Sequence, residues 1–267
     1  MSSSFFVKLH DRGAVLVNGP DARNFLQGLI TNDLNLLDSQ PMVYSCLLTP
    51  QGKFMFDFFM TKQDDTIQLE CEGGTRATML MNRLNHFKLR SKVTLEAIAE
   101  INVFQIVGET PSAESMPDPR HPALGFRAYV RPDNMPEYAF NEWDRHRILH
   151  AVPDGSRDLK LDQSTMADGR IDELNGVSYT KGCYMGQELT ARVHYRGLAK
   201  RSLVAIRAKE GAKNPFPTYG TDLRSGSTLL GEMRSSCGDV GLALVKDEAL
   251  PLLEKAGFLP LSTPASA

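Results

Sequence analysis

The sequence is poor in cysteine and tryptophan, has no long apolar run, and carries no excess of charge of either sign. Its 267 residues include four cysteines, one tryptophan, 30 Lys and Arg and 32 Asp and Glu, for a net charge of −2. A nucleic-acid binder would normally be basic. No segment approaches the roughly 18 apolar residues of a membrane-spanning helix. We therefore expect no nucleic-acid partner and no membrane contact.

The cysteines are too far apart in the sequence to suggest a shared site. Cys46, Cys71, Cys183 and Cys237 form no CxxC pair and no Cys/His spacing typical of zinc. We predict neither a disulfide nor a protein-only metal site, and we expect Cys46 and Cys71 to be small core residues in strands. The N-terminus lacks a signal-like apolar stretch, so the expected compartment is the cytoplasm or an organelle.

The pattern of apolar residues predicts an α+β protein. Residues 5–18 are expected to form two strands and residues 44–71 an antiparallel meander. Helical spacing predicts a helix after Asp21, which would cap it, and a second helix over residues 75–86. The second helix would bury Met79, Leu80 and Leu84.

Later in the chain, strands are predicted at 89–98 and 101–108 and helices at 141–150 and 187–192. The proline-rich stretch 112–122 is the best candidate for a linker. After Lys200, short strands between Gly and Pro turns predict a small barrel or sandwich.

The stretch KGCYMGQE, residues 181–188, places a cysteine among polar residues. Its two glycines allow a tight turn and a close approach of the backbone to a ligand. The following helix formers would place Cys183 near a helix N-terminus, and Lys181 lies two residues away. Both features favour a thiolate. A functional thiol and a structural turn both remain open, whereas a Cys-His pair with His194 would need a fold-back.

Other polar positions have alternative interpretations. Asp57 stands in the apolar strand FMFDFF, where alternation favours a water-facing side chain over a pocket with a shifted pKa. Lys88, Arg90 and Lys92 alternate and predict a solvated strand face, with an anion site for a polyglutamate or phosphate tail as the alternative. Asn32 is typical of a turn.

At KGCYMGQE the sequence resembles the YgfZ family, folate-binding relatives of the glycine-cleavage T-protein, an aminomethyltransferase. That family includes a mitochondrial factor acting late in the assembly of 4Fe–4S proteins. FLQGLITNDL, PQGKFMFDF, LNHFKLRSKV, RILHAVPDG and GEMRSS extend the resemblance over nearly the full length. It implies a T-protein-like cloverleaf around a central folate cavity. Its parts would be two intertwined α+β modules, 1–45 with 112–199 and an inserted 46–111, and a small C-terminal β-barrel, 200–267.

The resemblance also implies the functional residues. Cys183 would be the reactive thiol, with its pKa lowered by Lys181. The rest of the functional segment would shape and anchor the loop: Gly182, Tyr184, Gly186, Gln187 and Glu188. Asn32, Asp57 and Arg192 are weaker candidates for lining the folate cavity. T-proteins carry paired aspartates where this chain has Phe56-Asp57, and the missing carboxylate weakens the case for aminomethyl transfer.

Three functions follow from the resemblance. The favoured function is that of a tetrahydrofolate-binding accessory factor for the maturation or repair of 4Fe–4S proteins. In this role we favour a protein that is not an enzyme. The alternatives are a folate-dependent aminomethyl or methyl transferase with Asp57 as base, and a non-catalytic scaffold.

The implied cofactor is tetrahydrofolate or a derivative, with a transient iron–sulfur cluster as a further alternative. The implied partners are iron–sulfur assembly proteins and 4Fe–4S client enzymes. A processed eukaryotic chain would lie in the mitochondrial matrix.

Overall fold

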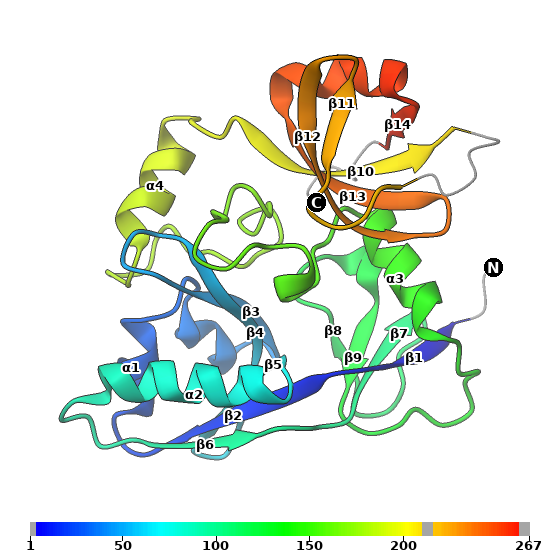
Figure 1. Ribbon diagram of the computed structural model, residues 1–267. Coiled ribbons are helices and arrows are strands. Elements are labelled where there is room, and N and C mark those ends of the chain that lie inside the picture. The colour runs from blue at the N-terminus through cyan, green and yellow to red at the C-terminus, as the bar shows by residue number, and fades with distance from the viewer. Residues whose placement is uncertain (1–3, 210–215, 262–267) are drawn as a thin grey trace.

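Three antiparallel sheets and four α-helices make up the computed structural model, which describes residues 4–209 and 216–261 (Figure 1). The first sheet joins the N-terminal strand to strands from the middle of the chain. In spatial order its strands are β1 Phe5–Leu9, β7 Val103–Val107, β9 Phe126–Ala128 and β8 Met116–Pro117.

The second sheet contains the predicted meander. In spatial order its strands are β3 Val43–Leu48, β4 Phe54–Gln63, β5 Thr66–Glu72, β2 Arg12–Asn18 and β6 Thr94–Ile98. The chain passes from β1 in the first sheet directly into β2 in the second, so the two sheets share a continuous N-terminal segment (Figure 1).

The third sheet comes from the C-terminal part, as the short strands after Lys200 predicted. In spatial order its strands are β11 Asp222–Ser225, β12 Thr228–Cys237, β13 Val240–Lys246, β10 Arg201–Ala208 and β14 Phe258–Pro260. In Figure 1 it lies above α3 (Phe140–Leu149), at the opposite end of the molecule from β6. Helix α3 contacts β1 of the first sheet and β12 and β13 of the third, and so connects the two.

The remaining helices are short. They are α1 Ala22–Gln27, α2 Thr75–Lys88 and α4 Gln187–Tyr195, and the 3-10 helices are Leu34–Asp38, Pro122–Leu124, Gly155–Arg157 and Asp247–Ala256. Helix α2 covers the second sheet with Ala77, Leu80 and Leu84, all fully buried. The meander, the helices α2, α3 and α4 and the burial of Cys46 and Cys71 are confirmed. The other predicted strands are also confirmed, except that the strand expected over residues 89–98 begins only at Thr94.

Asp21 is the N-cap residue of α1, as predicted, but its carboxylate accepts from the backbone N–H of Lys92 and not from its own helix. Two local predictions were wrong. Met79 is exposed because it faces away from the sheet. Lys88, Arg90 and Lys92 share no strand, since Lys88 ends α2 and β6 begins only at Thr94.

The three-module division stays a prediction, and the sheets run across its boundaries. Strand β2 pairs with β5 across position 45, and β7 pairs with β1 across position 45 and with β9 across position 111.

One buried carboxylate links the first two sheets. Glu70 on β5 is fully buried and accepts hydrogen bonds from Arg12 Nε at 2.9 Å and from Arg127 Nη2 on β9. Tyr129 donates to its second oxygen at 3.2 Å. Although burial opposes ionisation, Arg127 and Arg12 hold the pKa of Glu70 below its ordinary value. Two strands from one sheet and one from the other therefore meet at a single anion.

Replacing this anion by a neutral amide, Glu70→Gln, should lower the free energy of unfolding by about 3–5 kcal/mol, because the buried Arg127 loses its close charge partner and keeps only Asp118, 3.9 Å away. The lowered pKa means that the stabilisation is present above the ordinary value of 4.5 and is lost as the pH falls through the folded-state pKa. Urea unfolding at pH 7 and pH 4 measures both effects. The exposed Glu96→Gln on β6 is the control, and an equal, small change in both variants would contradict the prediction.

Candidate functional site

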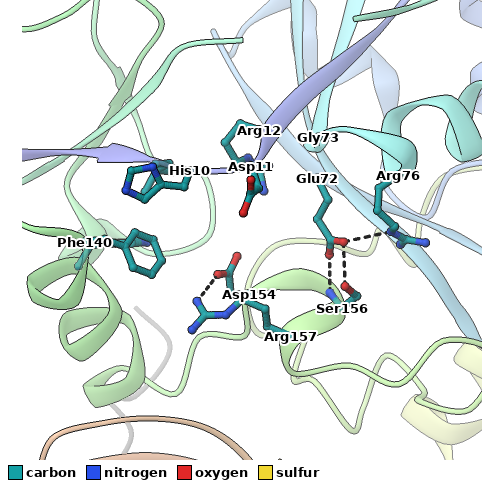
Figure 2. A pocket seen from close by; sticks show the side chains of 12 residues that line it. His10, Asp11, Arg12, Glu72, Gly73, Arg76, Phe140, Asp154, Ser156 and Arg157 are labelled. Atoms are coloured by element: carbon teal, nitrogen blue, oxygen red, sulfur yellow. Dashed lines mark hydrogen bonds and ion pairs between the residues drawn. The ribbon is translucent and has the colours of Figure 1, made fainter. Parts of the chain in front are cut away.

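A cavity of about 510 Å³ lies among the β1–β2 junction, the end of β5, α3 and the 3-10 helix Gly155–Arg157 (Figure 2). This volume is typical of sites for small molecules. We refer to it as the central cavity. Its lining residues are Leu9, His10, Asp11, Arg12, Glu72, Gly73, Arg76, Phe140, Trp143, Asp154, Ser156 and Arg157.

Glu72, at the end of β5, holds one wall of the central cavity in place. Its Oε2 accepts from Ser156 Oγ at 2.8 Å and from Arg76 Nε at 3.0 Å, and its Oε1 accepts from the Ser156 backbone N–H. Gly155 has φ +47°, and a Cβ there would lie 2.1 Å from Glu72 Oε1 and 3.1 Å from Asp57 Oδ1. A glycine is therefore required for the two carboxylates to approach this turn.

Asp57 on β4 is half-buried beside this turn, and Tyr44 donates a hydrogen bond to its Oδ2 at 3.0 Å. Burial, with the nearby carboxylate of Glu72 adding to it, raises the pKa of Asp57 to about 6. The water-facing interpretation that alternation favoured was wrong, because Gly155 and Tyr44 cover this position. A carboxyl group that titrates near neutral pH can hold or release a proton.

Arginine–carboxylate pairs surround the central cavity. Arg157 donates to Asp154 Oδ2 at 2.7 Å and to Asp144 Oδ1 at 3.0 Å. Although burial opposes it, the charges of Arg147 and Arg157 hold the pKa of Asp154 down at about 2. Figure 2 shows the carboxyl groups of Asp11 and Asp154 pointing toward each other. Asp11 is exposed and lines the cavity, which leaves its carboxylate accessible to a ligand.

Cys183 is exposed and lies in the segment just before α4. Its expected position near a helix N-terminus is therefore confirmed. Lys181 is buried, and its Nζ donates to the carbonyls of Ile30 at 2.8 Å and Asn32 at 2.7 Å. Burial lowers the pKa of Lys181 to about 8, against the opposing charge of Asp33. We expected Lys181 to activate the thiol; its ammonium group instead anchors the base of the loop to the segment after α1.

The second glycine of the loop allows it to dock on the β3–β4 turn. Gly186 has φ +82°, and a Cβ there would lie 2.6 Å from Thr49 O and 3.0 Å from Gly52 Cα. Gln187 Oε1 accepts from the backbone N–H of Tyr184 at 3.4 Å, which closes the turn. The loop around Cys183 is thus fixed at both of its ends.

The other predicted residues have different surroundings. A Cβ at Gly182 would meet nothing within 4 Å, and Glu188 is exposed on α4, as is Arg192. Asn32 is buried, and its Nδ2 donates to the carbonyls of Tyr44 at 2.8 Å and Asn175 at 2.7 Å. None of these four lines the central cavity.

The sequence pointed to the cysteine loop and did not identify the residues that line the central cavity. None of the predicted site residues lines it, and Asp57 alone lies beside it, through Gly155. The segment VPDGSRD, residues 152–158, contained the available signal, because an Asp-Gly turn amid charged residues is typical of a functional loop.

Residues 4–209 and 216–261 contain no group of three or more His, Cys, Asp and Glu side chains arranged to hold a metal ion. None of their helices combines the length and hydropathy needed to cross a bilayer.

Comparison with known proteins gives consistent matches. The GCVT N-terminal domain family matches residues 6–116. The chain is 31% identical over 281 residues to the iron-sulfur cluster assembly factor IBA57, mitochondrial, of Homo sapiens, covering 91% of this chain and 78% of that protein. It is 32% identical over 226 residues to the IBA57 homolog, mitochondrial, of Mycosarcoma maydis, covering 74% of this chain and 56% of that protein.

Among solved structures, the glycine cleavage system aminomethyltransferase T from Bartonella henselae matches with a TM-score of 0.71 and 14% identity. The match covers 91% of this chain and 78% of that chain. At this identity the likeness shows the fold, which is aminomethyltransferase-like.

Asp57→Asn should stabilise the protein more at pH 8 than at pH 4. The folded-state pKa of Asp57 is raised from 3.8 to about 6. Between these two pH values the folded state therefore holds the proton more tightly than the unfolded state does. Wild-type stability therefore decreases as the pH rises through this range, and asparagine removes that loss. Urea unfolding at both pH values measures the difference. Asp65→Asn, in the exposed β4–β5 turn, is the control; equal effects at both pH values would show that Asp57 titrates normally.

Proposed function

This chain belongs to the family of the iron–sulfur cluster assembly factor IBA57, and on that basis we propose that it acts in the assembly of iron–sulfur proteins. The observation that carries this proposal is 31% identity across 91% of the chain to a relative named for that role. The aminomethyltransferase-like fold agrees with the GCVT domain match.

The cysteine loop supports the proposal. Cys183 is the most accessible of the four cysteines, since Cys46 and Cys71 are buried and Cys237 is half-buried. The anchoring of Lys181 and the docking of Gly186 hold the thiol in a defined place without covering it. A thiol presented in this way can contact a partner protein or its cluster.

We propose that the cluster is cargo that this chain contacts and passes on. The described residues offer no set of three ligands, so a cluster touched by Cys183 would take its other ligands from another protein. The partners would be iron–sulfur assembly proteins and 4Fe–4S client enzymes. The relatives' names place those proteins in mitochondria; for this chain the bacterial cytoplasm and the mitochondrial matrix remain the two predicted locations.

We further propose that the three sheets correspond to the lobes of a cloverleaf and that the central cavity binds tetrahydrofolate. Phe140 and Trp143 supply an aromatic wall on which a flat ring can stack. The carboxylates of Asp11 and Asp154 can accept hydrogen bonds from the amino and ring N–H groups of a pterin. The volume of about 510 Å³ suits a ligand of this size.

Bound tetrahydrofolate would supply a carrier for one-carbon units. The residues of this chain would orient it: Glu72 fixes Ser156 and with it the cavity wall, and Arg157 fixes Asp154. These contacts join groups of the chain itself and order the cavity wall, so that little further entropy would be lost on binding.

A second candidate function, one-carbon transfer from an aminomethyl or methyl donor, is favoured by one observation. The pKa of Asp57 is raised to about 6, which suits a general base. Production of methylene-tetrahydrofolate from N-methylated glycine derivatives tests it, and no turnover across that class of donors would eliminate it. A scaffold that binds no folate is the third alternative, and calorimetry with tetrahydrofolate distinguishes it.

Cys183→Ala should abolish function in cells. In a strain lacking this protein, the specific activity of a 4Fe–4S enzyme should be restored by the wild type but remain at the level of the empty strain with Cys183→Ala. Cys237→Ala, which alters the half-buried cysteine of β12, is the matched control and should restore activity. Full activity without the protein would eliminate the assembly role, and equal rescue by both variants would make Cys183 structural.

Phe140→Ala should weaken tetrahydrofolate binding at least about tenfold, because it removes an aromatic wall of the central cavity. Isothermal titration calorimetry gives the dissociation constants. Tyr138→Ala, two residues earlier and outside the cavity lining, should bind like the wild type. Similar losses in both variants would place the ligand elsewhere.

A further inference from the structure

The second half of α4 and the segment that joins it to β10 form an exposed, basic surface. Residues 194–200 are all exposed, and so is Arg192 on the helix. In Figure 1 the helix lies at the left edge of the molecule, and the chain runs from there to β10. We refer to this region as the α4 surface; its exposed cations and large side chains are Arg192, Tyr195, Arg196, Leu198 and Lys200.

The charge of the α4 surface is positive because the sequence supplies cations there without acids. From residue 189 to residue 209 the chain has no Asp or Glu. Glu188, one turn before Arg192, is the single acid of α4, against the three cations of the surface. A partner of complementary charge is therefore acidic.

Two carboxylates close to this surface already have partners. Asp168 accepts from Nε and Nη2 of Arg201 at 3.0 and 3.1 Å. Asp172 accepts from the hydroxyl of Tyr179 at 3.2 Å and lies 3.3 Å from Nδ1 of His194. Both are engaged on the inner side of the segment, so the positive balance of the α4 surface is kept.

Tyr195 is an exposed aromatic side chain on a rigid support. It is 69% exposed, and its ring centroid lies 5.1 Å from that of His194 and 5.8 Å from that of Tyr179. Those two rings stack on each other at 3.7 Å. Tyrosine and arginine are the residue types enriched where binding energy concentrates in protein interfaces. An aromatic ring held in place also loses little entropy when a partner covers it.

A small cavity opens beside the α4 surface. Its volume is about 150 Å³, and we refer to it as the α4 pocket. Leu189 and Val193 of the helix, with Met166 and Ala167 opposite, give it an apolar lining, and the exposed Ala199 lies at its edge. A cavity of roughly 150 Å³ holds a group the size of a benzene ring. The pocket therefore fits one apolar side chain of a partner, up to the size of phenylalanine.

The α4 surface and Cys183 lie close enough for one partner to cover both. The thiol precedes the first turn of α4, and the surface begins at its second half. The helix has nine residues and is about 14 Å long. A protein partner typically covers about 800 Å² on each side of an interface, which spans that length.

We propose that the α4 surface docks an acidic segment of the protein that carries the iron–sulfur cluster, and that this segment inserts one apolar side chain into the α4 pocket. The inference rests on the proposed assembly function and deepens it, because it names the chemistry of the partner and the surface that receives it. Docking there would bring the partner's cluster to Cys183.

The binding test uses a synthetic nonapeptide with one phenylalanine between two runs of four glutamates, labelled for fluorescence anisotropy. At low salt it should bind the full chain with a dissociation constant below about 1 mM, and added salt should weaken it. A glutamine version of the peptide, and a version with alanine in place of phenylalanine, should each bind at least about tenfold less tightly. No binding of the first peptide at this concentration, or equal binding of all three, would overturn the inference.

The charge of the surface is tested by Arg192→Glu combined with Arg196→Glu, two exposed positions whose change leaves the core intact. This variant should bind the first peptide at least about tenfold less tightly. Lys62→Glu combined with Lys255→Glu, which reverses two exposed cations elsewhere, is the matched control and should bind like the wild type. Equal behaviour of the two variants would overturn the inference.

The pocket is tested by Ala199→Phe, which places a ring at its edge. This variant should lose the preference for the phenylalanine peptide over the alanine peptide and bind both as the wild type binds the latter. An undiminished preference would show that the phenylalanine lies elsewhere and would overturn the docking mode.

In a strain lacking the protein, Arg192→Glu with Arg196→Glu should leave the activity of a 4Fe–4S enzyme near the level of the empty strain, whereas the Lys62/Lys255 control should restore it. Equal rescue by both would overturn this inference and leave the assembly role standing. Full activity in the empty strain would remove the assembly role and, with it, the identity of the partner.

Two other occupants of the α4 surface give different results. A wild-type dimer in solution that Arg192→Glu with Arg196→Glu converts to a monomer would overturn the inference in favour of contact between copies of this chain. Binding to phosphatidylserine vesicles, with no preference among the three peptides, would overturn it in favour of an anionic membrane surface.

Discussion

The buried ion cluster at Glu70 is the interaction on which the arrangement of the N-terminal half depends. Two arginines and a tyrosine from both N-terminal sheets converge on this one carboxylate, inside a core where an unpaired charge would be very costly. Arg12 is at the same time part of the wall of the central cavity. The contact that fixes the two sheets therefore also fixes the position of that wall.

The central cavity owes its shape to charge pairs as well as to packing. Glu72 and Asp57 approach one turn from adjacent strands, and Gly155 leaves space for both oxygens. Burial, with the nearby anion of Glu72 adding to it, raises the pKa of Asp57 to about 6. The cavity wall thus combines carboxylates that stay ionised, such as Asp154, with one that titrates.

The cysteine loop and the central cavity differ in shape and in the groups that they present. The loop exposes one thiol on a backbone that Lys181 and Gly186 tie to neighbouring segments. The cavity is concave and lined by paired charges and aromatic rings. A protein with both can bind a small molecule at one place and meet a protein partner at another.

The sequence by itself determined the strands, the helices and the position of Cys183 before α4, because alternation, helical spacing and glycine turns are local properties. The resemblance of KGCYMGQE indicated the family for the same local reason. Only the tertiary structure decided that Asp57 is covered, that Lys181 binds distant carbonyls and that Asp154 faces Asp11. Each of these depends on segments roughly a hundred or more residues apart, whose approach is set by long-range packing and buried charge that no local pattern encodes.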